Sequence, residues 1–163
     1  MALVGIISDS HENVNAIQKA VALFNERKVS VMLHAGDIIS PMVASYLQKI
    51  QTSFYAVFGN NDGERFVWRQ RVNGWGQIYE RYFETTIDGK KILLMHEPYN
   101  LQALAKSQEY DILIYGHTHK VDNRLVGKTL VLNPGENCGF QSGKCTAAIL
   151  DTDLLKAEIV ELY

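Results

Sequence analysis

The sequence is poor in cysteine, with only Cys138 and Cys145 among its 163 residues. Two cysteines are too few for a zinc knuckle or a disulfide framework, and we expect both to be free thiols. No apolar run is long enough to cross a membrane. The amino terminus also lacks the basic segment that precedes the apolar run of a signal peptide. These absences predict a soluble, cytoplasmic protein with no membrane partner.

The sequence also lacks an excess of charge of either sign. Its net charge at pH 7 is -2, from 16 Lys and Arg residues against 18 Asp and Glu residues. General nucleic-acid binders carry a strongly positive surface, so a nucleic-acid partner is unsupported. Internal repeats, low-complexity tracts and flexible linkers are absent too, and the length is typical of one domain. We therefore expect a single domain over residues 1–163, and a homodimer remains open.

Short apolar runs alternate with helical patterns in the first third of the chain. Asn13 is a candidate N-cap for a helix, because the apolar residues after it recur at helical spacing. Ser40 precedes a proline and is a candidate N-cap for a second helix. Its apolar stripe consists of Met42, Tyr46 and Ile50, with Val43 and Leu47 beside them. Strands and helices in this alternation predict right-handed parallel crossovers and a sheet covered on both faces. The predicted strands are residues 3–7, 30–33 and 54–58.

The pattern changes after residue 62. Residues 63–77 are irregular, and we expect a solvated loop or subunit contact there, with a phosphate-binding lip as the alternative. Two apolar runs around Asp88-Gly89 predict a hairpin with a tight turn, and Asn100 is a candidate cap for a short helix. The remaining apolar runs, from residue 124 onward, suggest antiparallel strands. This order fits a mixed α/β sandwich of two sheets between helices.

Five apolar runs share one property, which is that each ends in Asp, Asn or His. Carboxyl ends of strands in open α/β sheets form the edge where ligands bind. Within Asp9-x-His11 and His117-x-His119, the one-residue spacing places both side chains on the same side of extended backbone. Five such endings predict one shared site. The candidate residues are Asp9, His11, Asp37, Asn60, His96, His117 and His119.

These residue types predict a metal centre. Imidazole nitrogens with carboxylate and amide oxygens suit manganese, iron, cobalt, nickel or zinc, and the lack of thiolates argues against structural zinc. Seven candidates are too many for one ion but suit two ions that share a carboxylate. Two ions about 3.5–4 Å apart clamp the attacking and leaving oxygens of an in-line displacement, and a hydroxide that bridges them supplies the nucleophile. The chemistry therefore predicts phosphoester hydrolysis.

In their order, these motifs resemble those of the calcineurin-like metallophosphoesterases, and in length most resemble the small prokaryotic YfcE-like phosphodiesterase branch. The resemblance implies a four-layer α/β/β/α sandwich with two mixed sheets. It also implies a dinuclear centre, with Mn²⁺ expected and Ni²⁺, Fe²⁺, Co²⁺ or Zn²⁺ as alternatives. The implied ligands are Asp9, His11 and His119 for one ion, Asn60, His96 and His117 for the other, and Asp37 as the bridge. The motifs are Asp9-x-His11, Gly36-Asp37, Gly59-Asn60-x-Asp62, His96, Gly116-His117-x-His119 and Asn133-Pro134-Gly135.

One position departs from the family pattern. Many members have His directly after the Gly-Asn pair, where this chain has Asn61, which cannot act as an acid. General acid catalysis contributes about 10²–10⁴-fold, so we expect slow turnover of esters with poor leaving groups. Activated diesters such as bis-p-nitrophenyl phosphate are the expected substrates of choice. The candidate catalytic residues are Asp37, Asn60 and Asn61.

Several neighbouring residues allow more than one interpretation. His34 is expected to pack in the interior or to orient a ligand. Asp62 either caps the following helix or hydrogen-bonds a ligand imidazole, Asn61 either faces substrate or sits in a turn, and Asn133-Pro134-Gly135 predicts a turn. For the whole chain, a phosphodiesterase acting on a small phosphodiester is the leading hypothesis. The alternatives are a non-catalytic interaction scaffold on the same fold and a phosphomonoesterase or nucleotidase.

Overall fold

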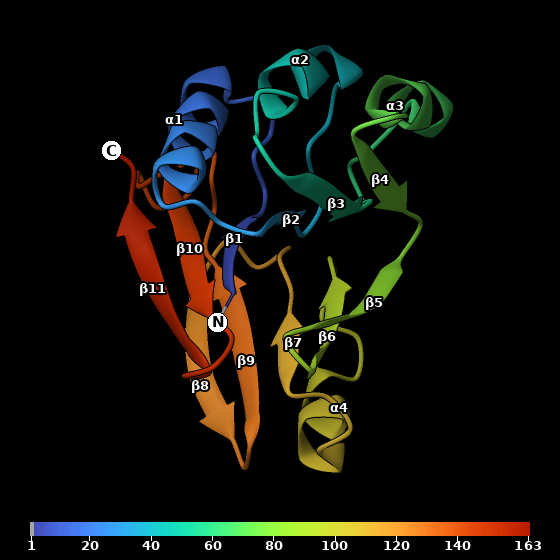
Figure 1. Ribbon diagram of the computed structural model, residues 1–163. Helices are drawn as coiled ribbons and strands as arrows, with labels where there is room; N and C mark the ends of the chain where they lie inside the picture. Colours follow the sequence, from blue (N-terminus) through green and yellow to red (C-terminus); the bar gives the residue numbers. More distant parts are fainter. Residues whose placement is uncertain (1) are drawn as a thin grey trace.

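The computed structural model, which describes residues 2–163, has four layers (Figure 1). Helices α1, α2 and α3 cover one face of a six-stranded sheet, and a five-stranded sheet packs against its other face. Helix α4 covers the outer face of the second sheet. This is the predicted α/β/β/α sandwich.

The first sheet has the order β11-β10-β1-β2-β3-β4. Strands β1, β2 and β3 run parallel, as the strand–helix alternation predicts, the edge strand β4 is parallel to β3, and β10 joins β1 antiparallel. The sheet is therefore mixed. Its strands are β1 (Leu3–Ile7), β2 (Val31–His34), β3 (Ser53–Val57), β4 (Gly76–Tyr79), β10 (Thr146–Asp151) and β11 (Lys156–Glu161).

The second sheet has the order β5-β6-β7-β9-β8 and is also mixed. Strands β6, β7 and β9 are parallel, and the edge strands β5 and β8 are antiparallel to their neighbours. The predicted hairpin is confirmed, because Ile87 pairs with Lys90 across the two-residue turn Asp88-Gly89. Its strands are β5 (Tyr82–Ile87), β6 (Lys90–Met95), β7 (Ile112–Ile114), β8 (Val121–Val126) and β9 (Thr129–Pro134).

The first predicted helix is confirmed and the second is only partly so. Helix α1 (Val14–Glu26) begins after Asn13, whose Oδ1 accepts the N–H of Ala16 at 3.1 Å. The second segment is a 3₁₀ turn, η1 (Pro41–Val43), followed by the short helix α2 (Ala44–Leu47). The predicted apolar stripe is wrong at Met42, which is 80% exposed, while Val43, Leu47 and Ile50 are buried. A 3₁₀ turn has three residues per turn, so it rotates the side chains away from helical register.

The loop predicted for residues 63–77 is wrong. The segment contains helix α3 (Arg65–Val72) and strand β4. Trp68 is fully buried, and its Nε1 donates to the carbonyl oxygen of Ile39 at 3.1 Å. Only Trp68 and Val72 of this helix are buried. The polar residues around them hide the helical period, and tertiary contacts through Trp68 hold the segment.

Two further predictions of local structure need correction. Helix α4 (Leu101–Ser107) begins after Asn100, but Asn100 has left-handed backbone and its side chain makes no cap. The turn predicted at Asn133-Pro134-Gly135 is instead the end of β9, since the strand continues through Pro134. The chain turns at Gly135, where φ is +81° and the N–H donates to Asn133 Oδ1 at 2.9 Å.

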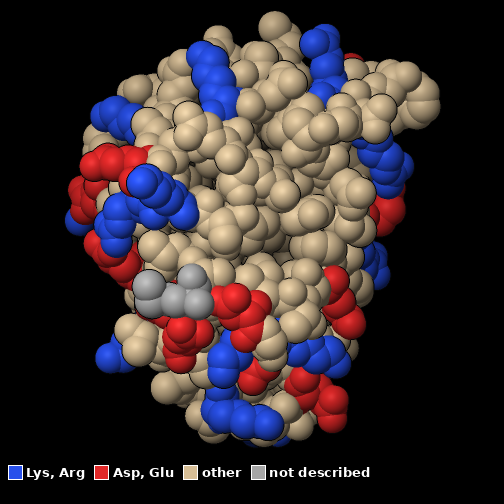
Figure 2. Space-filling model, viewed as in Figure 1, with Lys and Arg blue, Asp and Glu red and all other residues tan. Residues whose placement is uncertain are grey.

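Apolar packing between the layers positions the functional edge. One core lies between α1–α3 and the first sheet, a second lies between the sheets, and a third lies beneath α4. Burying one large apolar side chain contributes about 1.5–3 kcal/mol, so these cores hold the strand ends firmly. None of the helices within residues 2–163 has the length and apolar character of a membrane span. On the face drawn in Figure 2, basic and acidic side chains are interspersed and form no continuous basic band.

Candidate metal centre

The seven predicted ligands meet at one edge of the two sheets. They come from the loops that follow β1, β2, β3, β6 and β7. Backbone hydrogen bonds join these loops, since the N–H of Asp9 donates to the Gly36 carbonyl and the N–H of Gly116 to the His96 carbonyl, both at 3.0 Å. Contacts of 3.5 Å or less link Asp9 with His119, Asp37 with His11 and His96, and Asn60 with His96 and His117.

Asp37 lies between two groups of side chains. Its Oδ2 is 3.5 Å from His11 Nε2, and its Oδ1 is 3.5 Å from His96 Nε2. Burial alone would raise its pKa, but the hydrogen bond and charge of His96, together with hydrogen bonds from Asn61, lower the pKa of Asp37 below its usual value. A charged carboxylate with one oxygen toward each group has the geometry that a bridging ligand needs.

One group, here called the Asp9 half, consists of Asp9, His11 and His119. His119 Nε2 lies 3.3 Å from Asp9 Oδ1, and the ring centroids of the two histidines are 5.2 Å apart. The other oxygen of Asp9 accepts hydrogen bonds from Ser8 Oγ at 2.6 Å and from the His117 N–H at 3.0 Å. Those two donors fix the carboxylate so that Oδ1 faces the centre of the group.

The other group, the Asn60 half, consists of Asn60, His96 and His117. Asn60 Oδ1 lies 2.9 Å from both His96 Nε2 and His117 Nδ1. His96 Nδ1 is 2.7 Å from the Ala35 carbonyl oxygen, which only accepts, so this nitrogen carries a proton. In the neutral imidazole, Nε2 is then an acceptor that faces another acceptor, Asn60 Oδ1. A proton or a cation between them makes this contact favourable.

Unpaired atoms show whether the residues fit a metal ion. Asp9 Oδ1 and His11 Nε2 are buried and have no hydrogen-bond partner within residues 2–163. Such unpaired atoms are rare in native proteins and cost about 1–3 kcal/mol each. Ligand atoms of Asp9, Asp37 and His96 also lie within 4.8 Å of one another. Converging carboxylate and imidazole lone pairs suit a divalent transition-metal ion, so the donor set fits the group that the sequence predicts.

The backbone beneath the cluster is strained. Five of the seven residues have left-handed φ values, a conformation that costs non-glycine residues about 1–3 kcal/mol each and concentrates at functional sites. Two glycines make the close packing feasible. A Cβ at Gly59 would collide with the Asp37 carboxylate, and one at Gly116 with Ser8 Oγ. The left-handed residues are Asp9 (50°), His11 (39°), Asp37 (58°), His117 (65°) and His119 (59°).

Glu136 is a functional candidate that the sequence analysis missed. Its carboxylate is almost fully buried, and Oε2 lies 2.6 Å from His119 Nδ1. Burial would raise its pKa, but hydrogen bonds from Ser142, His119 and Gln141 lower the pKa of Glu136 to about 2. A charged carboxylate on Nδ1 directs the other ring nitrogen, Nε2, toward the Asp9 half. Its sequence signal is a sixth apolar run, Thr129–Leu132, followed closely by polar residues.

Asp62 has neither of its two predicted roles. Its carboxylate accepts the backbone N–H groups of Asp37 at 3.0 Å, Ile38 at 2.8 Å, Ile39 at 2.6 Å and Gly59 at 2.7 Å. It does not cap α3, which begins after Glu64 without a side-chain cap. Asp62 therefore ties the loop after β2 to the loop after β3. Spacing in the sequence cannot reveal contacts to the backbone of a loop that lies 23–25 residues away in the chain.

His34 is a packed histidine, as one of its predicted roles requires. It is fully buried, its Nδ1 accepts the N–H of Gly36 at 3.1 Å, and its Nε2 lies 2.9 Å from Ser10 Oγ. Burial lowers the pKa of His34 to about 3, so the ring is neutral. Since Nδ1 accepts, Nε2–H donates to Ser10. His34 supports the loops after β1 and β2, and its two ring nitrogens hydrogen-bond Ser10 and Gly36 and not the seven candidates.

Asn61 is fastened to Asp37. Its backbone N–H donates to Asp37 Oδ1 at 2.9 Å and its Nδ2 to Asp37 Oδ2 at 2.7 Å. Both oxygens of the carboxylate are therefore held from the side of the loop that follows β3. This arrangement restrains the rotation of Asp37.

Both cysteines are free and buried, as predicted. Cys138 lies against the Asp9 half, where its Sγ is within 4.8 Å of the ring nitrogens of His11 and His119. Burial raises the pKa of the Cys138 thiol to about 12. The sulfur therefore lies next to two candidate ligands in a setting that favours the thiol over the thiolate.

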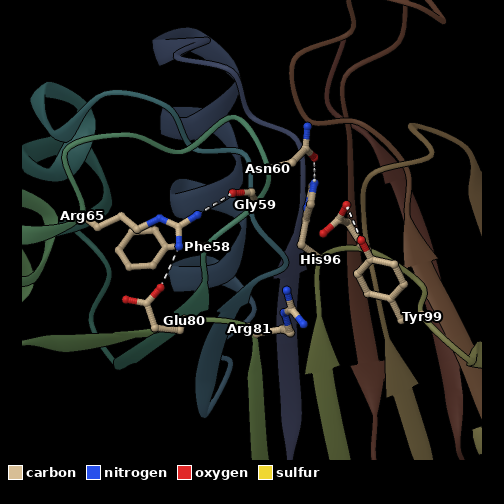
Figure 3. Close-up of a pocket in the computed structure, with 9 residues that line it drawn as sticks. Phe58, Gly59, Asn60, Arg65, Glu80, Arg81, His96 and Tyr99 are labelled. Carbon is tan, nitrogen blue, oxygen red and sulfur yellow. Dashed lines mark hydrogen bonds and ion pairs between the residues drawn. The ribbon is translucent and has the colours of Figure 1, made fainter.

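A cavity of about 240 Å³ opens beside the Asn60 half. Asn60 and His96 form one side, and Phe58, Arg65, Arg81 and Tyr99 surround the rest (Figure 3). The cavity therefore connects directly to the candidate ligands.

Comparison with known proteins identifies the family. The model of the calcineurin-like phosphoesterase superfamily domain matches residues 2–154. The chain belongs to this superfamily. A phosphodiesterase of Methanocaldococcus jannaschii is 37% identical over 155 residues, which cover 92% of this chain and 93% of the relative. The resemblance to metallophosphoesterases read from the motifs is confirmed.

Three solved structures share the fold of this chain. A structure described as a novel archaeal phosphodiesterase superposes with a TM-score of 0.91 at 34% identity, covering 98% of this chain and 99% of that one. YfcE, a phosphoesterase from E. coli, gives a TM-score of 0.75 at 21% identity, covering 99% and 100% of the two chains. Vps29 from Entamoeba histolytica gives 0.71 at 24%, covering 98% of each. The last two likenesses concern the fold alone.

Proposed function

We propose that this calcineurin-like phosphoesterase is a metal-dependent phosphodiesterase with two divalent ions. They would bind at the edge of the two sheets where the seven candidate ligands meet, here called the rim. Asp9, His11 and His119 would hold one ion, and Asn60, His96 and His117 the other, with Asp37 between them. The observation that carries the proposal is the pair of unpaired buried atoms, Asp9 Oδ1 and His11 Nε2, inside a cluster of acceptors. When bound, the ions would supply a water of lowered pKa as nucleophile and a positive field for the phosphate.

Several residues of the chain would hold the ligand side chains in the orientation that this chemistry needs. Asp37 presents one oxygen to each half, and Asn61 prevents its carboxylate from rotating. Glu136 fixes the His119 ring, and the Ala35 carbonyl fixes the His96 ring, so that both direct Nε2 at the centre. Asn61 is thus proposed as a positioning residue. Asn61 has no acidic proton to give to a leaving group. Substrates whose leaving group departs without protonation should therefore react fastest.

The proposal is tested with activated substrates. Protein reconstituted with Mn²⁺ should hydrolyse bis-p-nitrophenyl phosphate faster than p-nitrophenyl phosphate at equal concentration. Two divalent ions would bring four positive charges, and the carboxylates of Asp9 and Asp37 with one hydroxide would leave a single positive charge, which suits a diester monoanion better than a monoester dianion. Faster hydrolysis of the monoester would instead support the phosphomonoesterase or nucleotidase alternative. Stoichiometric metal with no hydrolysis of either ester would support the non-catalytic scaffold.

The complete donor set disfavours the scaffold alternative. Each of the seven candidate ligands is present and lies within contact distance of another member of the set. A scaffold has no need of unpaired buried atoms or of five strained backbone positions at one rim. Cytoplasmic location, Mn²⁺ as the metal in the cell, a single domain over 1–163 and a homodimer stay predictions of the sequence.

A further inference from the structure

The cavity beside the Asn60 half is placed to hold part of a substrate. Its volume of about 240 Å³ is below the roughly 300–1,000 Å³ of sites that take whole drug-sized ligands. Because Asn60 and His96 form one wall, a phosphodiester at the proposed centre would direct one of its two ester arms into this space. The cavity therefore accommodates one arm and not a whole larger molecule.

Arg65 lines this cavity, and its charge is neutralised together with that of Arg69, which follows it on α3. Arg65 Nη1 pairs with Glu80 Oε2 at 2.7 Å, and Arg69 pairs with the other oxygen of the same carboxylate. The guanidinium carbons also lie over the Phe58 ring, at 5.0 Å for Arg65 and 5.5 Å for Arg69. Hydrogen bonds from Arg69 and Arg65 lower the pKa of Glu80. These charges hold α3 against the link between the two sheets.

Arg81 differs from both, although it is the next residue after Glu80. Within residues 2–163, no carboxylate oxygen lies within 4.0 Å of its guanidinium nitrogens. Its charged group instead lies 5.7 Å from the centre of the Tyr99 ring. Glu80 cannot neutralise it, because both oxygens of Glu80 already face α3. In Figure 3, Arg81 is drawn between Glu80 and Tyr99, with no dashed line to either.

The one other carboxylate of the cavity lining is partly engaged. Glu97 Oε1 accepts the hydroxyl of Tyr99 at 3.1 Å, and this hydrogen bond raises the pKa of Tyr99. Tyr99 therefore hydrogen-bonds Glu97 through its hydroxyl, and the Arg81 guanidinium lies over its ring. An arginine with five free donors in a planar fork matches a phosphate group better than any other side chain.

We propose that Arg81 selects phosphodiesters in which one ester arm carries a second phosphate group. This inference rests on the proposed phosphodiesterase function and assigns its substrate class. The scissile phosphate would lie at the rim, with the second phosphate of the same arm on the Arg81 guanidinium. Diesters with uncharged arms would still react, but they would lack this contact.

A matched pair of substrates tests the inference. Thymidine 3′-(p-nitrophenyl phosphate) and its 5′-phosphorylated derivative release the same chromophore and differ by one phosphate. We expect the wild-type kcat/KM to favour the phosphorylated ester about tenfold, which is typical of a charge-assisted contact. Arg81→Gln should reduce this ratio to near one, while Arg81→Lys should keep part of the preference because it keeps the charge. Lys106→Gln, which removes one charge from the exposed side of α4, is the control and should keep the wild-type ratio.

The outcomes separate the inference from the proposed function. An unchanged ratio in Arg81→Gln, with both esters cleaved, overturns the role of Arg81 and leaves the phosphodiesterase intact. Failure of the wild type to cleave either ester contradicts the phosphodiesterase proposal instead. Calorimetric binding of thymidine 3′,5′-bisphosphate and thymidine 3′-phosphate to the Mn²⁺-reconstituted protein then tests Arg81 alone. A preference for the bisphosphate that Arg81→Gln does not reduce overturns the inference.

Discussion

The two halves of the candidate centre differ in how their ligand atoms are satisfied. In the Asp9 half, Asp9 Oδ1 and His11 Nε2 are buried without hydrogen-bond partners. In the Asn60 half, the Asn60 oxygen already contacts His96 Nε2 and His117 Nδ1 at 2.9 Å. An ion entering the Asp9 half breaks no hydrogen bond of these two atoms and meets only longer contacts, of 3.3 Å to Asp9 Oδ1 and 3.5 Å to His11 Nε2, whereas an ion entering the Asn60 half must displace contacts of 2.9 Å. The two ions therefore need not bind equally, and we expect the Asp9 half to bind its ion more tightly.

Removing the residue between the halves should have the largest effect. Asp37→Ala deletes the oxygens that face His11 and His96, so we expect both ions to be lost and hydrolysis of bis-p-nitrophenyl phosphate to fall to background. Folding should change little, because the substitution also removes a buried charge. Metal content by elemental analysis and the diesterase rate check this, with circular dichroism as the control for folding. Retained activity in the folded variant would contradict the proposed mechanism.

Loosening the frame that both halves share should have the next largest effect. Asp62→Asn places an amide donor against backbone N–H groups that now donate to a carboxylate, and we expect a loss of about 3 kcal/mol in the free energy of unfolding. Asp111→Asn is the matched control, because within residues 2–163 the Asp111 side chain accepts a single hydrogen bond, from the Lys91 N–H at 2.8 Å. Urea denaturation measures both variants. Equal losses would show that Asp62 does no more than an ordinary turn residue.

Weakening one half alone should have a smaller and selective effect. Glu136→Gln removes the charge on His119 Nδ1, and loss of such a supporting carboxylate lowers metal affinity about 10–100-fold. We expect that loss for the tighter ion and little change for the weaker one, as measured by competition with a metal-binding dye. Glu109→Gln, on the exposed surface after α4, should bind both ions as the wild type does. Equal weakening of both ions would remove the distinction between the halves.

The candidate ligands could be predicted from the sequence, whereas the residues that support them could not. The seven candidates were found because each follows an apolar strand. The carboxyl ends of parallel strands meet at one edge of a sheet. Asp62 and Glu136 act through backbone N–H groups and through another side chain, so neither motif spacing nor periodicity shows their roles. Glu136 also stands two residues after β9, where the predicted turn concealed a strand end.

The parts of the fold that could be predicted are likewise those set by residues close together in the sequence. Parallel β1 to β3 and the hairpin of β5 and β6 come directly from local pattern, because alternation and turn residues lie close in sequence. Helix α3 was missed because three of its four apolar residues, Phe66 to Trp68, are consecutive, so that the period of a buried helix face is not visible. Its place is set by contacts distant in sequence, such as that of Trp68 with Ile39. The mixed order of the strands in each sheet also depends on such distant pairing.

We expect the rim to hold two ions with unequal affinity. Anomalous diffraction from crystals soaked at increasing Mn²⁺ concentration shows directly in which order the two sites fill. We predict a first peak among Asp9, His11 and His119 at low concentration, then a second among Asn60, His96 and His117. No peak at this rim, at a concentration that saturates the protein in solution, would contradict the account.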